Sequence, residues 1–279
     1  MAASRGGVTR GQRVRPEDIY RWGPVWSRRV GWVLDHVWWN TEVHGAENVP
    51  ASGPVIIASN HTGIVDGPVL HGALPRGSHI LVKQEFFDSR IGFLMTWAGQ
   101  IPVDRASGRA ALATGKALLD EGRVVGIFPE GTRGRGDVSE VRAGVAWLAV
   151  NTGAPIVPAA CLGTRRSGDR HGYVPPPRSK LHVVLGEPIT IAPPAGASRR
   201  ERMNHAIEAI GAGLAAHVAR AVAITGLALP TGDAETRPGP TGPLAAPSPG
   251  DAGSAGSPAD AGPGRTGPPV GPGPADKEE

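Results

Sequence analysis

A histidine and an aspartate five positions apart are the residues of this chain best suited to acid–base chemistry. His61 and Asp66 lie in the run SNHTGIVDGP, which directly follows the apolar stretch 54–58. On one regular helix this spacing would turn the two side chains roughly 140° apart, so a hydrogen bond between them requires a turn, which Gly63 makes possible. Asp66 would then fix the imidazole tautomer and leave the other ring nitrogen free to take a proton. We therefore expect general-base chemistry on a hydroxyl group that the substrate brings.

Three further blocks follow this pair along the chain. Alone, the pair is a weak signal, because a histidine in a polar turn is more often a solvated or capping residue. The additional blocks are GQIPVDR at 99–105, FPEGTR at 128–133 and APIVPA at 154–159. Each contains or borders a strand-like apolar run, so the four blocks together are much more specific than the pair.

The four blocks resemble the glycerolipid acyltransferase family, and most closely its 1-acyl-sn-glycerol-3-phosphate (lysophosphatidate) acyltransferases. The resemblance covers roughly residues 40–190 in the family's block order. It implies an enzyme that moves a fatty acyl group from acyl-CoA or acyl carrier protein to the free hydroxyl of 1-acyl-sn-glycerol-3-phosphate, giving phosphatidic acid. It also implies that His61 is the general base, that Asp66 orients it and that the hydroxyl attacks the thioester directly. Cys161 then needs no catalytic role and suits a buried position in an apolar strand.

A second group of residues is expected to bind the substrates. Arginine offers a planar fork for a phosphate group, and in the family the block that matches Glu130 contributes to acceptor binding. For Arg105 and Arg133 the alternative is a surface ion pair with Asp104 or Glu130, and for Lys83 it is a solvated strand end. For Glu130 the alternative is a brace for its loop, and Asn60 is expected to position His61. The candidate substrate contacts are Glu130, Gly131, Thr132, Arg133, Arg105, Lys83 and Asn60.

No metal site or cofactor is expected. The nine histidines lack clustered carboxylate or cysteine ligands at useful spacing in the sequence. The acyl thioester is a substrate, so the resemblance requires no resident group.

The elements that must position these residues alternate between extended and helical patterns. Strand-like runs are expected at 54–58, 79–83, 101–103, 124–128, 156–161 and 181–185. Helical patterns are expected at 68–74, 89–98, 109–121 and 142–150, and a last helix opens at Ser198 with a capping box to Glu201. Such alternation predicts an α/β fold in which helices flank a mostly parallel central sheet, similar to glycerol-3-phosphate acyltransferases.

The N-terminal residues 1–39 are rich in tryptophan and arginine. A helix is expected from Pro24 to Trp39, with one apolar stripe formed by Trp26, Val30, Val33 and Val37. Further tryptophans and the cations Arg28 and Arg29 surround it, as is typical of a helix at the headgroup level of a membrane. The same stripe could instead pack on the protein's own core. The segment 89–98 has a similar ambiguity, because its apolar side chains suit either an acyl-chain tunnel or the core.

Composition indicates three regions: 1–39, an acyltransferase domain at 40–229 and a disordered tail at 230–279. The last 50 residues contain 12 prolines and 11 glycines, and no apolar periodicity. They carry seven acidic and three basic residues, so the preceding part has a formal charge of +8, against +4 for the whole chain. Five basic residues form a possible surface patch: Arg165, Arg166, Arg170, Arg178 and Lys180.

A basic body favours an anionic partner such as a membrane surface, a phosphorylated substrate or nucleic acid. No nucleic-acid motif is present, so no nucleic acid is expected. The N-terminus lacks the apolar core of a signal peptide, and prolines and glycine divide the uncharged stretch 143–164 into a short helix and a strand. We therefore expect a peripheral enzyme on the cytoplasmic face of the cell membrane. The alternatives are the same chemistry on another lysophospholipid, glycerol-3-phosphate or a glycolipid, and a non-catalytic membrane-binding module.

Overall fold

The computed structural model describes residues 14–104, 108–130, 135–138, 141–170, 172–192 and 195–231. The chain divides into two compact units, Met1–Arg237 and Pro238–Glu279, and every described residue belongs to the first. Of the predicted tail, only residues 230 and 231 are described, so the expectation of disorder there lies outside the described residues.

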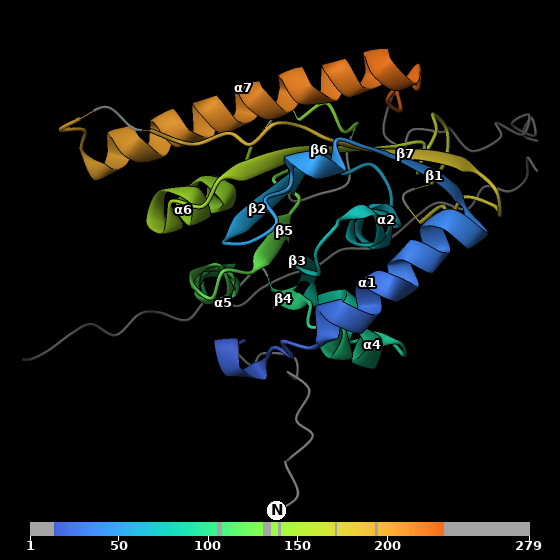
Figure 1. Ribbon diagram of the computed structural model, residues 1–279, viewed down its shortest axis with the longest axis horizontal. Helices are drawn as coiled ribbons and strands as arrows, with labels where there is room; N and C mark the ends of the chain where they lie inside the picture. The colour runs from blue at the N-terminus through green and yellow to red at the C-terminus, as the bar shows by residue number, and fades with distance from the viewer. Residues whose placement is uncertain are drawn as a thin grey trace, which may run out of the picture. The chain divides into compact units, whose positions relative to one another are not determined.

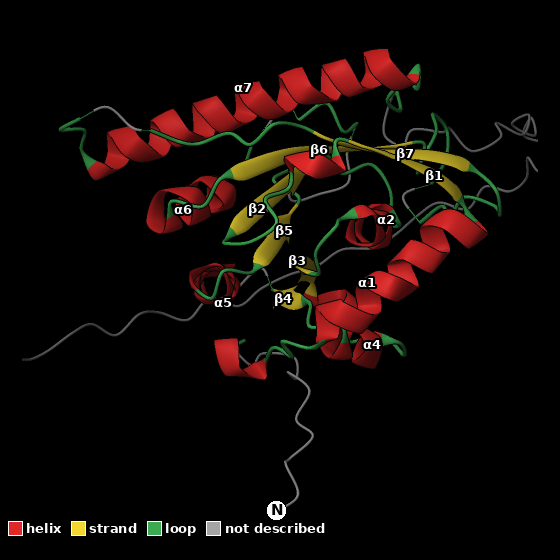
Figure 2. Cartoon of the chain, in the orientation of Figure 1, coloured by secondary structure: helices red, strands yellow, loops and turns green. Residues whose placement is uncertain are grey.

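Seven strands of the described chain form one mostly parallel sheet (Figures 1 and 2). Their spatial order is β1 (Asn40–His44), β7 (Lys180–Leu185), β6 (Ile156–Leu162), β2 (Val55–Ser59), β5 (Val124–Ile127), β3 (Ser78–Lys83) and β4 (Ile101–Val103). Strands β2 to β6 are parallel, whereas β7 pairs antiparallel with β6 and parallel with β1. The predicted α/β fold and its six strands are confirmed, and β1 is an addition.

The helices agree with the predicted pattern except near the N-terminus and around residue 90. They are α1 (Gly23–Val33), α2 (Asp66–Ala73), α3 (Gln84–Phe87), α4 (Gly92–Trp97), α5 (Gly108–Asp120), α6 (Ala143–Thr152) and α7 (Arg199–Thr225). Short turns add η1 (Pro16–Asp18), the π-helical η2 (Leu34–Trp38) and η3 (Ala46–Asn48). The helix predicted at 89–98 is α4 alone, and the one predicted at 24–39 is α1 continued by η2.

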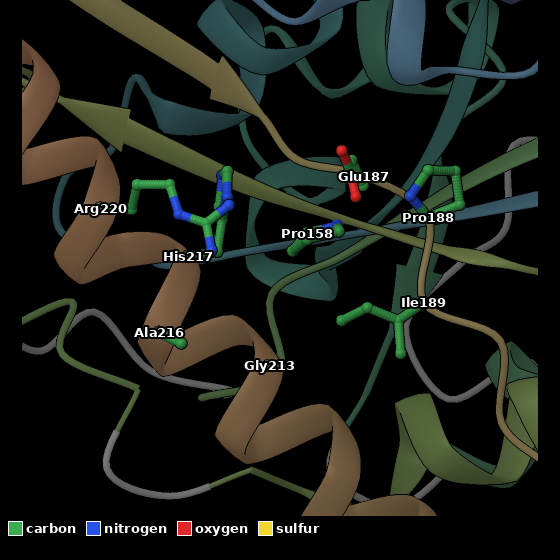
Figure 3. A pocket seen from close by; sticks show the side chains of 8 residues that line it. All are labelled: Pro158, Glu187, Pro188, Ile189, Gly213, Ala216, His217 and Arg220. Atoms are coloured by element: carbon green, nitrogen blue, oxygen red, sulfur yellow. The ribbon is translucent and has the colours of Figure 1, made fainter.

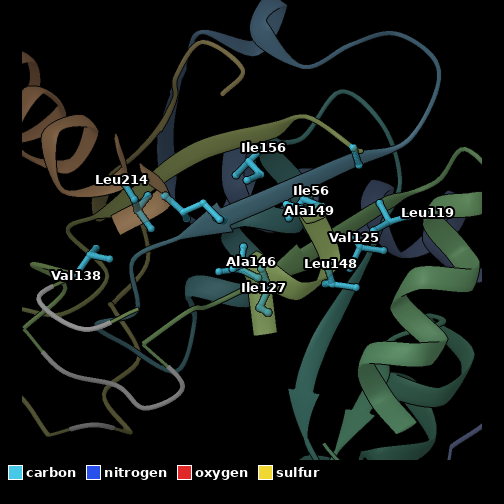
Figure 4. Packing of buried hydrophobic residues seen from close by; sticks show 14 of the residues in the cluster. Ile56, Leu119, Val125, Ile127, Val138, Ala146, Leu148, Ala149, Ile156 and Leu214 are labelled. Carbon is cyan, nitrogen blue, oxygen red and sulfur yellow. The ribbon is translucent and has the colours of Figure 1, made fainter. Parts of the chain in front are cut away.

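Side chains of each central strand alternate between two hydrophobic cores. On β2, Ile56 and Ala58 face the core that contains α5, α6 and α7, while Val55 and Ile57 face the core that contains α2. Figure 4 shows the first of these cores, where Ile56 and Val125 meet the buried face of α6. This alternation explains why β2 reads as a continuous apolar run, because both of its faces are covered by helices. The sheet is therefore the middle of three layers (Figure 1).

Helix α7 lies across the first core and is held at its start by the predicted capping box. Ser198 Oγ accepts from Glu201 N at 3.3 Å, and Glu201 Oε2 accepts from Ser198 N at 2.7 Å. One stripe is buried against the sheet: Ala206, Ile210, Leu214, Val218 and Ala221. Among the described helices, α7 is also the one whose length and apolar composition would allow it to cross a membrane. The stretch 143–164 is a helix followed by a strand, as predicted.

Helix α1 packs on the outer side of α2 through small residues. Gly23, Ser27 and Gly31 are buried on α1, whereas Val30, Val33 and Val37 are exposed. A Cβ at Gly31 would lie 2.8 Å from the Cα of Gly72 on α2, so the two helices approach more closely than a side chain permits. The three valines of the predicted apolar stripe therefore do not face the core, so the core interpretation of the stripe is wrong for them.

This close approach predicts a loss of stability on adding a single methyl group. Gly31→Ala should lower the free energy of unfolding by about 1–3 kcal/mol, because the added carbon forces α1 away from α2. Gly67→Ala, in α2 itself, is the control, since a Cβ there meets nothing within 4 Å. Denaturant unfolding of both variants tests the helix contact. Equal free energies of unfolding for Gly31→Ala and Gly67→Ala would contradict the close contact between α1 and α2.

Candidate active site

His61 and Asp66 lie on the turn between β2 and α2, at the carboxyl edge of the parallel strands. His61 follows the end of β2 by two residues, and Asp66 is the first residue of α2. His61 Nδ1 and Asp66 Oδ2 are 2.9 Å apart, so the hydrogen bond expected from the turn is present. Gly63 lies at a bend in this turn, and its backbone N–H donates to the same oxygen at 2.8 Å. A ligand-binding position at this edge is typical of open α/β sheets.

The surroundings of the pair fix its orientation. Asp66 Oδ2 also accepts from Thr62 N at 2.6 Å, so two backbone donors and the imidazole converge on one oxygen. The imidazole stacks on Phe128 with 4.3 Å between ring centroids. The Asp66 side chain is fully buried, whereas that of His61 is 16% exposed. The imidazole is therefore the member of the pair that a substrate can reach, and its Nε2 is the nitrogen that Asp66 does not engage.

Glu130 connects the loop after β5 to the histidine turn. Its Oε1 accepts from the backbone N–H of His61 at 3.1 Å. Burial raises the pKa of Glu130 to about 7; the His61 N–H lowers it, the carboxylates of Asp137 and Asp66 raise it, and the Gly136 N–H lowers it. These contacts match the bracing role that the sequence left open for Glu130, because its carboxyl group is engaged by backbone donors.

The backbone contact predicts different effects for two substitutions of Glu130. Glu130→Gln retains an oxygen that accepts from His61 N, so turnover should stay within about threefold of the native value. Glu130→Ala leaves that donor without its acceptor and should lower turnover about tenfold or more. Initial acyl-transfer rates of the two variants test this contact. Equal rates for the alanine and glutamine variants would contradict it.

The raised pKa of Glu130 also predicts a pH dependence of stability. The folded-state pKa of about 7 exceeds the ordinary value of 4.5. Between pH 4.5 and pH 7 the folded chain therefore binds more protons than the unfolded chain. The free energy of unfolding should therefore fall as the pH rises from about 4.5 to about 7, by about 1–3 kcal/mol from this group. Denaturant unfolding at several pH values should show this slope in the native chain and a smaller one in Glu130→Gln. An unchanged slope in the variant would refute the assignment.

The other predicted substrate contacts are placed unevenly. Asn60 is fully buried and clamps the end of β2 to β6: its Oδ1 accepts from Cys161 N at 2.8 Å and its Nδ2 donates to Cys161 O at 3.3 Å. Asn60 therefore positions the histidine turn by joining the end of β2 to the neighbouring strand β6. Lys83 is the last residue of β3, at the same edge of the sheet as the histidine turn. Strand β5 lies between β3 and β2, so Lys83 is two strand spacings, roughly 10 Å, from the end of β2. Four predicted residues lie outside the described part of the chain: Arg105, Gly131, Thr132 and Arg133.

Arg165 belongs to this edge and not to the predicted surface patch. Its exposed fraction is 2%, whereas Arg166, Arg170 and Arg178 are exposed. A Cβ on Gly63 would lie 3.5 Å from the Cβ of Arg165, so the arginine borders the histidine turn. Arg165 lies just beyond β6, the parallel neighbour of β2. Its position after an apolar run is the sequence feature that could have indicated this placement.

Cys161 has no exposed surface, and burial raises the pKa of its thiol well above the ordinary value. A neutral buried thiol is a poor nucleophile. The cysteine therefore serves as a small buried side chain on β6, as the sequence suggested.

A cavity of about 270 Å³ lies elsewhere, between α7 and the segment that follows β7 (Figure 3). It is lined by Pro158, Glu187, Pro188, Ile189, Gly213, Ala216, His217 and Arg220. None of the predicted site residues belongs to this lining. Its position on the α7 side of the sheet separates it from the His61 turn.

Large apolar side chains are exposed on α1, η2 and α4 and on the residues directly before α1 and α4. Trp26 Nε1 donates to Trp97 O at 3.2 Å, which joins α1 to α4. Side chains on both elements are about half exposed or more, and we call this set the aromatic surface: Trp22, Val25, Val30, Trp32, Val33, Val37, Trp38, Ile91, Phe93 and Trp97. Ile91, Phe93 and Trp97 therefore face solvent, so the core interpretation of the segment 89–98 is wrong for these three residues. An exposed set of this many large apolar side chains is typical of a surface that interacts with a protein or a membrane.

Comparisons with known proteins agree with the fold and with the family that the sequence resembles. Residues 40–162 match the acyltransferase family, a range that includes both His61 and Asp66. A 1-acyl-sn-glycerol-3-phosphate acyltransferase of Bacillus subtilis is 35% identical over 172 residues, which cover 61% of this chain and 83% of the relative. A human 1-acyl-sn-glycerol-3-phosphate acyltransferase beta is 32% identical over 42% of this chain and 44% of the relative.

The crystal structure of the 1-acyl-sn-glycerophosphate (LPA) acyltransferase from Thermotoga maritima has the same fold. The TM-score is 0.51 at 22% identity, over 68% of this chain and 78% of that protein. The fold and the sequence together define an acyltransferase enzyme. The chain belongs to the glycerolipid acyltransferase family, among the enzymes of the 1-acyl-sn-glycerol-3-phosphate type.

Proposed function

We propose that this enzyme transfers a fatty acyl group from a thioester to the free hydroxyl of 1-acyl-sn-glycerol-3-phosphate, forming phosphatidic acid. The observation that carries the proposal is the 2.9 Å hydrogen bond in which Asp66 Oδ2 accepts from His61 Nδ1, on an imidazole side chain that is 16% exposed. With Nδ1 protonated toward Asp66, Nε2 is the basic nitrogen and accepts the hydroxyl proton.

The bond changes balance without an intermediate on the enzyme. The acceptor oxygen forms an ester bond to the acyl carbon as its proton passes to Nε2 of His61. The carbon–sulfur bond breaks, and the leaving thiolate takes the proton from the imidazolium. The buried carboxylate of Asp66 stabilises the transient imidazolium and keeps the ring in one orientation.

Cations at the same sheet edge support a phosphate-bearing acceptor. Arg165 borders the histidine turn and Lys83 ends β3, while Arg105 and Arg133 are proposed from the sequence alone. An arginine fork binds a phosphate through two parallel hydrogen bonds, so it holds the glycerol hydroxyl at a fixed distance from the imidazole.

An acceptor panel tests this assignment. The full chain, with acyl-CoA as the thioester, should acylate lysophosphatidate faster than uncharged monoacylglycerol, glycerol-3-phosphate or lysophosphatidylcholine. Arg133→Glu should reduce turnover on phosphate acceptors more than on monoacylglycerol. A preference for an acceptor without a terminal phosphate would move the proposal to another lipid. Vesicle binding without turnover on any acceptor would favour a membrane-binding module.

The acyl donor is proposed to be acyl-CoA or acyl carrier protein, both of which are acidic. The positive formal charge of the chain favours either one. The two donors are separated by comparing kcat/KM for the same acyl group on CoA and on the carrier protein.

We further propose that the enzyme works as a peripheral protein on the cytoplasmic face of the cell membrane, where its lipid acceptor resides. The aromatic surface supports this, because tryptophans prefer the boundary between apolar chains and headgroups. The exposed cations Arg29 and Arg90 lie beside it and suit an anionic headgroup layer. Helix α1 packs on α2, which starts at Asp66, so the aromatic surface and the histidine turn belong to the same layer.

A further inference from the structure

A cluster of three metal-binding side chains occupies the edge of the sheet formed by β1 and β7. Glu42 and His44 are two positions apart on β1, so they project to the same face. His182 on β7 is the direct parallel partner of Glu42. The pairing of the two strands therefore brings together residues that lie about 140 positions apart in the sequence.

The distances within the cluster match those between ligands of one ion. His44 Nε2 and His182 Nδ1 are 3.2 Å apart, and Glu42 Oε2 lies 3.6 Å from His182 Nδ1 and 4.0 Å from His44 Nε2. Ligands at about 2.0–2.1 Å from a tetrahedral zinc ion are themselves separated by about 3.3 Å. A small contraction at Glu42 would therefore bring all three atoms into coordination range.

The surroundings leave the cluster partly open and aim one oxygen of Glu42 at the histidines. The His182 side chain is 5% exposed, whereas those of His44 and Glu42 are 38% and 44% exposed. Lys180 Nζ contacts Oε1 at 3.0 Å, so Oε2 is the oxygen that faces the histidines. The two imidazoles can share one proton between their facing nitrogens, and a divalent ion would take the place of that proton.

We propose that Glu42, His44 and His182 bind a divalent transition-metal ion, best Zn²⁺, with water as the fourth ligand. Two imidazoles and one carboxylate form a ligand set that binds zinc in preference to calcium or magnesium. No metal site was expected because the histidines lack clustered ligands at useful spacing in the sequence, and the pairing of β1 with β7 is what brings these three residues together. The ion would join the second half of β1 to β7.

The test is Zn²⁺ binding to the chelator-treated full chain, measured by isothermal calorimetry. We expect one ion per chain and a thermal unfolding temperature that rises with added Zn²⁺. Removing a residue that hydrogen-bonds to a metal ligand lowers metal affinity about 10- to 100-fold. Replacing a ligand itself, in His44→Asn or Glu42→Gln, should lower Zn²⁺ affinity by at least that factor. His205→Asn, an exposed histidine on α7, is the matched control and should bind like the native chain.

His44 is the preferred target because its side chain is 38% exposed, so its replacement leaves the buried packing of the sheet intact. Equal thermal unfolding temperatures of His44→Asn and the native chain, both without metal, verify that the variant folds. Affinity that survives both His44→Asn and Glu42→Gln would overturn the proposal, as would the absence of saturable binding by the native chain. Because the readouts are binding and stability, their outcome is independent of the acyl-transfer proposal.

Discussion

His61→Ala is expected to lower kcat for phosphatidate formation by about 100- to 10,000-fold, which is the range that a positioned general base contributes. The variant removes the imidazole whose Nδ1 is hydrogen-bonded to Asp66 and whose side chain is 16% exposed. Without it, the acceptor hydroxyl must lose its proton to water during attack on the thioester. Initial rates with labelled acyl-CoA and lysophosphatidate give the effect directly.

Two controls separate chemistry from folding in this prediction. Thermal unfolding of His61→Ala should stay close to that of the native chain, and His205→Ala, which replaces an exposed histidine on α7, should keep full turnover. Asp66→Ala should reduce turnover in the same direction, because the imidazole loses the acceptor that fixes its tautomer. A His61→Ala protein that folds and turns over within a few-fold of the native rate would show that another group is the base.

The second large effect concerns the aromatic surface. Trp32→Glu and Trp97→Glu are each expected to weaken binding to vesicles of anionic and zwitterionic phospholipid by about 10- to 100-fold. Each change removes about 100 Å² of apolar contact, or about 2 kcal/mol, and adds a charge that the anionic surface repels. Both side chains are about half exposed, at 48% and 50%, so the fold should tolerate the substitutions. Vesicle flotation measures the bound fraction.

Ile224→Glu provides the matched control for this surface. Ile224 is 58% exposed, but it lies on α7, on the opposite face of the sheet (Figure 1). Its substitution should leave vesicle binding unchanged if the membrane contacts α1 and α4. An equal loss in all three variants would point to α7 or to a nonspecific charge effect. Native affinity in both tryptophan variants would exclude the aromatic surface as the docking face.

The sequence predicted the central sheet because its strands are buried on both faces and read as apolar runs. Strand β1 was missed because its sequence, NTEVH, is mostly polar, and it becomes a strand only by pairing with β7. The packing face of α1 was missed for a different reason. Periodicity detects the valine stripe, but the close contact with α2 is made by Gly31 and Gly72, which carry no hydrophobic signal.

The candidate site was predictable as far as residue type and turn chemistry determine it. A histidine and an aspartate separated by a glycine-containing turn are enough to predict the hydrogen bond between them. The contact of Glu130 is different, because its partner is the backbone N–H of His61, and a sequence pattern does not reveal such a partner. Burial of Arg165 likewise depends on how the segment after β6 folds against Gly63.

Direct attack of the acceptor hydroxyl on the thioester is the central claim, and thiol release measured together with phosphatidate tests it most directly. The full chain is incubated with acyl-CoA and either lysophosphatidate or an analogue in which hydrogen replaces the free hydroxyl. We predict one phosphatidate for each thiol released with lysophosphatidate, and no release above background with the analogue or with acyl-CoA alone. A burst of thiol equal to the enzyme concentration in the absence of an acceptor hydroxyl would contradict direct attack and indicate an acyl-enzyme.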